Sequence, residues 1–272
     1  MKMKTGHFGL LDQAETIAKA GYDDVELHIW EIMSLDDGEY NAAKQKLRDI
    51  NIDCEVFDNP LPLDKVVADE DFDMEYYKEY LKKAVARTAE MGARYFVFGN
   101  GKTRSVPEAK AEEAKKKNDD LMVFLCDEAL KANITIMMEP LHQSISNRVL
   151  SIPEAYDYAQ SLGCRNLKTL LDFRWFIAGG HPYDDIVRYA DFVKHVHVDN
   201  PLYAFPERHV PMEKDGFDYK PLFDTLKSIG YKGIISFEAN TFSDFETDIK
   251  KGLELLRANN ITPYYEGRRE AV

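Results

Sequence analysis

Short runs of β-branched and aliphatic residues recur along the chain, and four of them end in side chains able to bind a metal ion. In the run 193–200, valines alternate with His195, His197 and Asp199. Because successive side chains of a strand point to opposite faces, these three polar groups would share one face. The other three runs are 134–139, 167–172 and 233–238, and they end in Glu139, Asp172 and Glu238.

The runs alternate with helical patterns, many of which stop at a glycine, as at Gly21, Gly92 and Gly163. The expected strands are 1–9, 23–28, 52–57, 94–99, 134–139, 167–172, 193–200 and 233–238. The expected helices are 10–20, 39–50, 72–91, 107–133, 152–162, 183–190, 217–229 and 243–259. A loop is expected from Asp172 through His181, and a long loop over 201–216.

Eight strand-helix units without a break in composition predict an α/β protein that folds as a (β/α)₈ TIM barrel. The 272 residues suit one such barrel, so a single domain over 1–272 is expected. An open doubly wound sheet is the alternative. It is disfavoured because no Gly-rich phosphate loop follows an early strand.

The carboxyl ends of the strands of a parallel barrel meet at one mouth, where the active sites of such barrels lie. Three carboxylates and one imidazole would therefore converge: Glu139, Asp172, His197 and Glu238. Their negative charges favour a bound divalent cation, and mixed oxygen and nitrogen ligands suit Mn²⁺, Mg²⁺, Co²⁺ or Zn²⁺. Taken singly, each acid could instead cap the next helix or face solvent.

Further polar groups are expected near the same mouth. His28 shares a strand face with Glu26 and is a candidate substrate contact, or else half of a solvated or internally hydrogen-bonded pair. Asn100, between two glycines, could offer its amide to a substrate hydroxyl, or it could only form a tight turn. His142 follows Glu139 in the loop after the same strand and is another candidate contact.

The composition narrows the range of partners. A net charge of −13 and a pI near 5.1 oppose binding of nucleic acid. Cys54, Cys126 and Cys164 contain no Cys-x-x-Cys pair and indicate reduced thiols. No signal peptide and no apolar stretch of about 18 residues is evident, so a cytoplasmic protein with no membrane partner is expected.

These strand ends, the phrase Gly21-Tyr22-Asp23-Asp24-Val25-Glu26-Leu27 and the triplet His195-Val196-His197 resemble the xylose isomerase-like TIM-barrel superfamily of sugar isomerases and epimerases. The likeness covers nearly the whole chain. It implies that Glu139, Asp172, His197 and Glu238 bind one divalent cation and that Glu139 and Glu238 also exchange protons with the substrate. It further implies that Arg208 contacts substrate oxygens.

Two departures from the family pattern lie among the residues that are expected to surround the substrate. Trp175 stands where members often have a histidine three residues after the metal aspartate, so it could stack on a sugar ring or simply pack in the core. The frequent Pro-Gly-x-Gly after the seventh strand is replaced by Pro211-Met212-Glu213-Lys214. Both changes leave the identity of the substrate open.

The expected function is a metal-dependent isomerase or epimerase of a small sugar, keto-sugar or polyol derivative, acting through a metal-stabilised enediolate. A dehydratase of a keto-polyol, of the inosose or dehydroshikimate type, is the close alternative. Glu207-Arg208-His209 resembles an element of abasic-site endonucleases, and a non-catalytic sugar-binding barrel also remains as an alternative. The expected partner is a small carbohydrate, and the chain could form a homo-oligomer.

Overall fold

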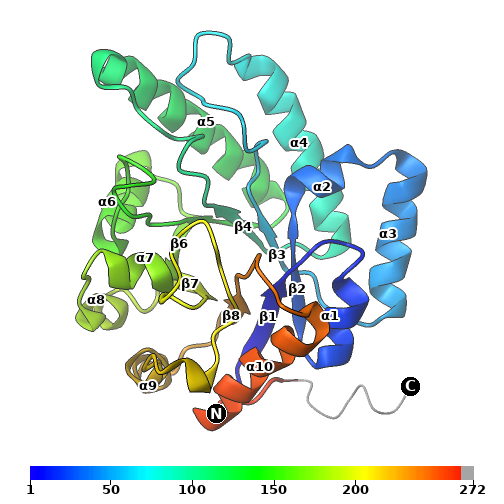
Figure 1. Cartoon of the computed structure of the whole chain (residues 1–272). Coiled ribbons are helices and arrows are strands. Elements are labelled where there is room, and N and C mark those ends of the chain that lie inside the picture. Colours follow the sequence, from blue (N-terminus) through cyan, green and yellow to red (C-terminus); the bar gives the residue numbers. More distant parts are fainter. Residues whose placement is uncertain (265–272) are drawn as a thin grey trace.

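In a computed structural model, which describes residues 1–264, eight parallel strands form a closed barrel in chain order (Figure 1). The strands are β1 Lys4–Phe8, β2 Asp24–His28, β3 Val56–Asp58, β4 Tyr95–Phe98, β5 Thr135–Met138, β6 Leu167–Asp172, β7 Val193–Val198 and β8 Ile234–Phe237. The barrel closes where β1 pairs with β8, with Gly6 beside Ser236. The predicted (β/α)₈ barrel is thereby confirmed.

Helices surround the strands on the outside of the barrel (Figure 1). They are α1 Ala14–Ala20, α2 Ile29–Ser34, α3 Asp37–Asp49, α4 Met74–Met91, α5 Ala111–Lys131, α6 Ile152–Leu162, α7 Phe173–Ala178, α8 Tyr183–Arg188, α9 Lys220–Ser228 and α10 Phe245–Ala258, with short 3₁₀ turns at Glu108–Lys110 and Glu213–Asp215. Within residues 1–264, no helix is both long and apolar enough to cross a membrane.

Several helices begin and end at residues suited to those positions. Asp36 and Glu39 form a reciprocal capping box at the start of α3. Ser151 accepts a hydrogen bond from the backbone N–H of Glu154 at the start of α6. Gly92 ends α4 with a φ of 109°, in the left-handed region where a side chain would be strained. These local signals explain why the boundaries of α4 and α6 follow the sequence closely.

Some expected boundaries were wrong. The segment after Asp172 is not all loop, because the Asp172 side chain accepts the backbone N–H of Trp175 and starts the short helix α7. Helix α2 was not predicted, and α1 begins at Ala14 rather than at residue 10. Strand β3 lies later than expected and ends at Asp58. The strand ends at the mouth were otherwise placed within one or two residues.

The interior of the barrel explains how the site is positioned. A small apolar cluster fills the barrel below the mouth: Val56, Val97, Met137, Leu170 and Ile234, with Tyr95 against it. Two positions after Met137 comes Glu139, and two positions after Leu170 comes Asp172, so both acids keep the inward direction of the apolar residues. The register between β6 and β7 shifts near Leu170 and then sets Asp172 beside His197.

Candidate functional site

Four predicted side chains meet at the mouth of the barrel. Ligand atoms of Glu139, Asp172, His197 and Glu238 all lie within 4.8 Å of one another, and the four could hold a metal ion. They follow or end strands β5, β6, β7 and β8, which are neighbours in the barrel. Glu139 and Glu238 therefore stand at the two ends of this arc, with Asp172 and His197 between them.

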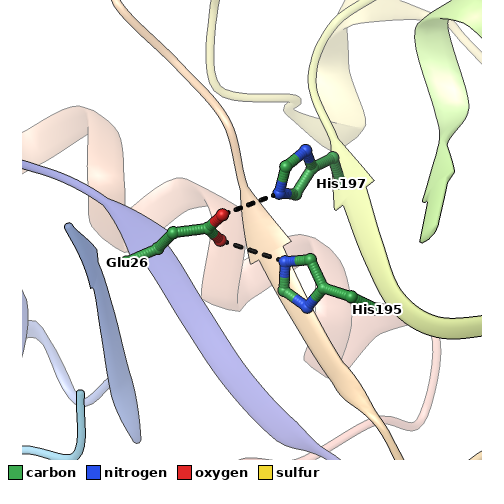
Figure 2. A group of neighbouring side chains, drawn as sticks. All are labelled: Glu26, His195 and His197. Carbon is green, nitrogen blue, oxygen red and sulfur yellow. Dashed lines mark hydrogen bonds and ion pairs between the residues drawn. The ribbon is translucent and has the colours of Figure 1, made fainter. Parts of the chain in front are cut away.

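A buried carboxylate on β2, Glu26, contacts the histidine of this cluster through the interior of the barrel (Figure 2). The two oxygens of Glu26 lie 3.0 Å from Nε2 of His195 and 3.0 Å from Nε2 of His197. All three side chains are almost completely shielded from solvent. If each Nε2 carries the proton that it donates to Glu26, Nδ1 of His197 is left as a lone-pair donor facing the cluster.

The protonation states of Glu26, His195 and His197 depend strongly on one another. Burial would raise the pKa of Glu26, but the two imidazoles outweigh it and hold that pKa well below the usual range. Burial lowers the pKa of His195. For His197 burial acts in the same direction, but Glu26 and Glu238 outweigh it and raise the pKa well above its usual value, so the metal-free ring would also carry a proton on Nδ1, which a bound cation would replace. Glu26 therefore stays ionised and accepts from both rings.

The donor set fits a divalent cation. Nδ1 of His197 and Oε2 of Glu238 lie 3.2 Å apart, and the same oxygen of Glu238 lies 2.8 Å from a terminal nitrogen of Arg208. Burial, and then the charges of Asp172 and Glu238, raise the pKa of Glu139 well above its usual range. Three carboxylates and one imidazole nitrogen that share a single guanidinium form a donor set that a divalent cation would satisfy.

Arg208 supplies positive charge next to this cluster. Its guanidinium nitrogens lie 3.0 Å from Asp172, 2.8 Å from Glu238 and 3.3 Å from Asp199. Burial would lower the pKa of Arg208, but these carboxylates keep it well above the usual value. The guanidinium also lies over the ring of Trp175, with 5.4 Å between its central carbon and the ring centroid.

A cavity of about 490 Å³ opens above the cluster. Of the residues predicted to contact substrate, four line it: His28, Asn100, Trp175 and Arg208. His142 does not. Its ring stacks on the indole of Trp175 with centroids 6.4 Å apart, and its Nδ1 lies 2.9 Å from the Ser144 hydroxyl. His142 therefore supports the wall of the cavity from outside.

Two of the lining residues are already engaged within the protein. Nδ1 of His28 lies 2.5 Å from a carboxylate oxygen of Asp58, so His28 is internally paired, with Asp58 rather than with Glu26. Burial opposes the charge on His28, but Asp58 outweighs it and the pKa of His28 is raised. The Asn100 amide donates to the carbonyl of Leu63 and accepts from the backbone N–H of Lys102, as a turn residue would.

Three charged residues of the site were not singled out from the sequence. Asp58 was missed because the third strand was expected to end before it. Arg174 lies 2.6 Å from Asp199, and Arg104 donates to the backbone carbonyl of Glu139. Both arginines act on partners more than 20 residues away, so no local pattern marks them. By contrast, Nε2 of His209 lies 3.4 Å from Glu207, and neither residue belongs to a metal-competent group among residues 1–264.

Gly99 leaves the space in which the Glu139 carboxylate lies. A Cβ at this position would overlap Oε2 of Glu139. We therefore expect Gly99→Ala to displace this carboxylate and to weaken binding of Mn²⁺ by about 10-fold or more, as loss of a well-oriented ligand does. Calorimetric titration of the purified variant with Mn²⁺ measures this.

The matched control is Gly38→Ala in α3, where the new Cβ would meet only Oδ1 of the surface residue Asp36, at 3.3 Å. This variant should bind Mn²⁺ like the wild type. Unchanged affinity in Gly99→Ala would mean that Glu139 can move without affecting the cluster.

The sequence of residues 14–259 matches the family of xylose isomerase-like TIM barrels. The chain belongs to this family. It is also 25% identical over 171 residues to a Xenopus laevis protein named "Putative hydroxypyruvate isomerase", and this alignment covers 60% of each protein. The aligned part thus spans about three fifths of the relative's length.

Solved structures of family members share the fold. A 3-keto-D-glucoside 4-epimerase from E. coli superposes with a TM-score of 0.77 at 16% identity, covering 94% of this chain and 99% of that one. A D-allulose 3-epimerase from Methylomonas sp., solved with D-allulose, gives a TM-score of 0.78 at 19% identity, covering 94% and 97%. At these identities the similarity establishes the barrel.

Proposed function

We propose that this protein is a metal-dependent isomerase or epimerase of a small sugar or keto-sugar, with Glu139 and Glu238 as its proton-transfer groups. The observation that carries the proposal is the position of these two carboxylates. They stand at opposite ends of the β5–β8 arc, both line the cavity, and both have ligand atoms within 4.8 Å of Asp172 and His197. A substrate carbon held between them could lose a proton to one and regain it from the other.

The four residues Glu139, Asp172, His197 and Glu238 would hold one Mn²⁺, Mg²⁺, Co²⁺ or Zn²⁺ ion. When bound, the ion would polarise the substrate carbonyl and stabilise the negative charge that develops as the neighbouring C–H is deprotonated. Asp172 and His197 would only hold the ion.

The substrate would be oriented by the remaining wall of the cavity. Arg208 lines the cavity, and a cation held by Asp172 and Glu238 would take over the charges that its guanidinium now neutralises, so Arg208 could donate to substrate oxygens beside the cluster. His28, held by Asp58, could offer Nε2 to a hydroxyl group. The names of the hydroxypyruvate isomerase relative and of the two sugar epimerases support isomerase or epimerase chemistry on a hydroxycarbonyl compound.

The reaction class is tested by hydrogen exchange. With Mn²⁺ and a panel of ketoses and keto-sugars in D₂O, we expect deuterium to enter recovered substrate or product at the carbon next to the carbonyl. Mass spectrometry and NMR locate the label. Product that has lost water would instead identify the dehydratase alternative. Turnover with no label at the reacting carbon would rule out proton transfer by the two carboxylates.

A further inference from the structure

The cavity carries more negative than positive charge. Asp58, Glu139 and Glu238 line it, and Arg208 is the sole lysine or arginine that does so within residues 1–264. The guanidinium of Arg208 is shared by Asp172, Asp199 and Glu238. His28, the other group able to carry positive charge, is paired with Asp58. Away from the metal-competent cluster, the cavity lining within residues 1–264 offers a phosphate or carboxylate no lysine or arginine, and the acidic residue there is Asp58.

Part of the cavity lining is apolar. We call Ile145, Trp175 and Phe205 the apolar rim, and all three line the cavity. The rings of Trp175 and Phe205 lie with their centroids 5.3 Å apart. Exposure rises outward along this wall, from 5% for Glu139 through 7% for Trp175 to 49% for Phe205. An aromatic side chain left half exposed at the edge of an open cavity is suited to pack against a ligand.

The cavity is also large for a three-carbon compound. Its volume of about 490 Å³ lies within the range of roughly 300–1,000 Å³ that is typical of pockets for drug-sized ligands. A hydroxypyruvate molecule bound at the carboxylates would leave the apolar rim without a partner. A ligand with a second ring would reach from the carboxylate cluster to the rim.

Resting on the proposed function, we propose that the substrate is an uncharged glycoside whose reacting sugar ring carries the ketone that the proton transfer requires. Its reacting sugar ring lies against the carboxylate cluster, and its aglycone or second sugar packs on the apolar rim. The lack of a lysine or arginine in the cavity lining away from the cluster, within residues 1–264, argues against phosphorylated sugars, and the rim selects for an apolar face at the far end of the ligand. This assigns substrate selection to Ile145, Trp175 and Phe205.

Binding can be measured without turnover, by using glycosides that lack the ketone and therefore cannot react. We suggest titration calorimetry of the Mn²⁺-loaded protein with methyl and phenyl β-glycosides of glucose, galactose and xylose, and with glucose and glucose 6-phosphate. Since the phenyl group would be buried on the rim, at least one phenyl glycoside should bind about 10-fold more tightly than its methyl partner. Glucose 6-phosphate should bind more weakly than glucose.

Substitutions in the apolar rim test whether these residues cause the preference for phenyl glycosides. In Phe205→Ala and Ile145→Ala the preference for phenyl over methyl should fall by about 3-fold or more. Leu202→Ala is the control, because Leu202 lies in the same loop, is 58% exposed and does not line the cavity. This control should keep the full preference. A preference that survives both rim substitutions would overturn the assignment.

The two proposals fail in different ways. Equal binding of every methyl and phenyl pair, no binding of any glycoside, or tighter binding of the phosphate would overturn the glycoside inference, even if ketoses still exchange deuterium. Selective binding of phenyl glycosides by a protein that never exchanges deuterium would support this inference and overturn the proposed function.

Discussion

Glu139→Gln and Glu238→Gln should each lower turnover by at least about 10²-fold, the lower end for loss of a catalytic acid or base. Each amide keeps the shape of the side chain but cannot accept and release the substrate proton. Turnover and deuterium uptake should fall together, even when excess Mn²⁺ restores metal binding. The measurement is the rate of label uptake at saturating metal for each variant.

Measuring the metal content distinguishes the role of Glu139 and Glu238 as metal ligands from their role in proton transfer. Elemental analysis should find about one divalent ion per wild-type chain and markedly less in the double variant, because two anionic ligands are lost. Glu207→Gln is the matched control, since this exposed carboxylate lies near Arg208 in the chain but outside the cluster. Normal metal content in the double variant, or full turnover in both single variants, would contradict the assignment.

The sequence predicted the candidate metal ligands, because each lies at or near the end of a strand that its own residues indicate. Alternation along 193–200 predicted the face on which His197 lies, and the positions of Glu139, Asp172 and Glu238 at the ends of apolar runs predicted that they meet it at the mouth. Barrel closure then brought their ligand atoms within 4.8 Å of one another. Because both steps depend only on a period of two and a parallel barrel, they could be made before the structure was known.

Contacts across the barrel could not be predicted in this way. Glu26 pairs with His195, 169 residues later, and Arg104 reaches the carbonyl of Glu139, 35 residues later. These contacts depend on the diameter of the barrel and on how loops fold over its mouth. His142 illustrates the same limit, because the loop after Glu139 turns its ring to the outer side of Trp175.

Glu26→Gln should weaken binding of Mn²⁺ by about 10- to 100-fold, although Glu26 is not one of the four candidate ligands. The glutamine oxygen can accept from only one of the two Nε2–H groups that Glu26 now accepts. The amide N–H of the glutamine would face the Nε2–H of the other histidine, and two donors cannot form a hydrogen bond with each other. That histidine must either leave a buried N–H unpaired or move its proton to Nδ1.

Either outcome has a measurable cost. An unpaired buried donor lowers the free energy of unfolding by about 1–3 kcal/mol, which denaturant titration of the metal-free protein detects. A proton moved to Nδ1 of His197 removes the lone pair that faces Glu238, so metal affinity falls instead.

Asp24→Asn is the matched control for Glu26→Gln, because Asp24 is equally buried on the same strand and lies outside both metal-competent groups. Burial already raises the pKa of Asp24 well above its usual range, so a neutral amide resembles its favoured state. The control should therefore bind Mn²⁺ like the wild type. If Glu26→Gln also keeps wild-type affinity and stability, the buried carboxylate does not orient His197, and the lone pair at Nδ1 must be fixed by the cluster itself.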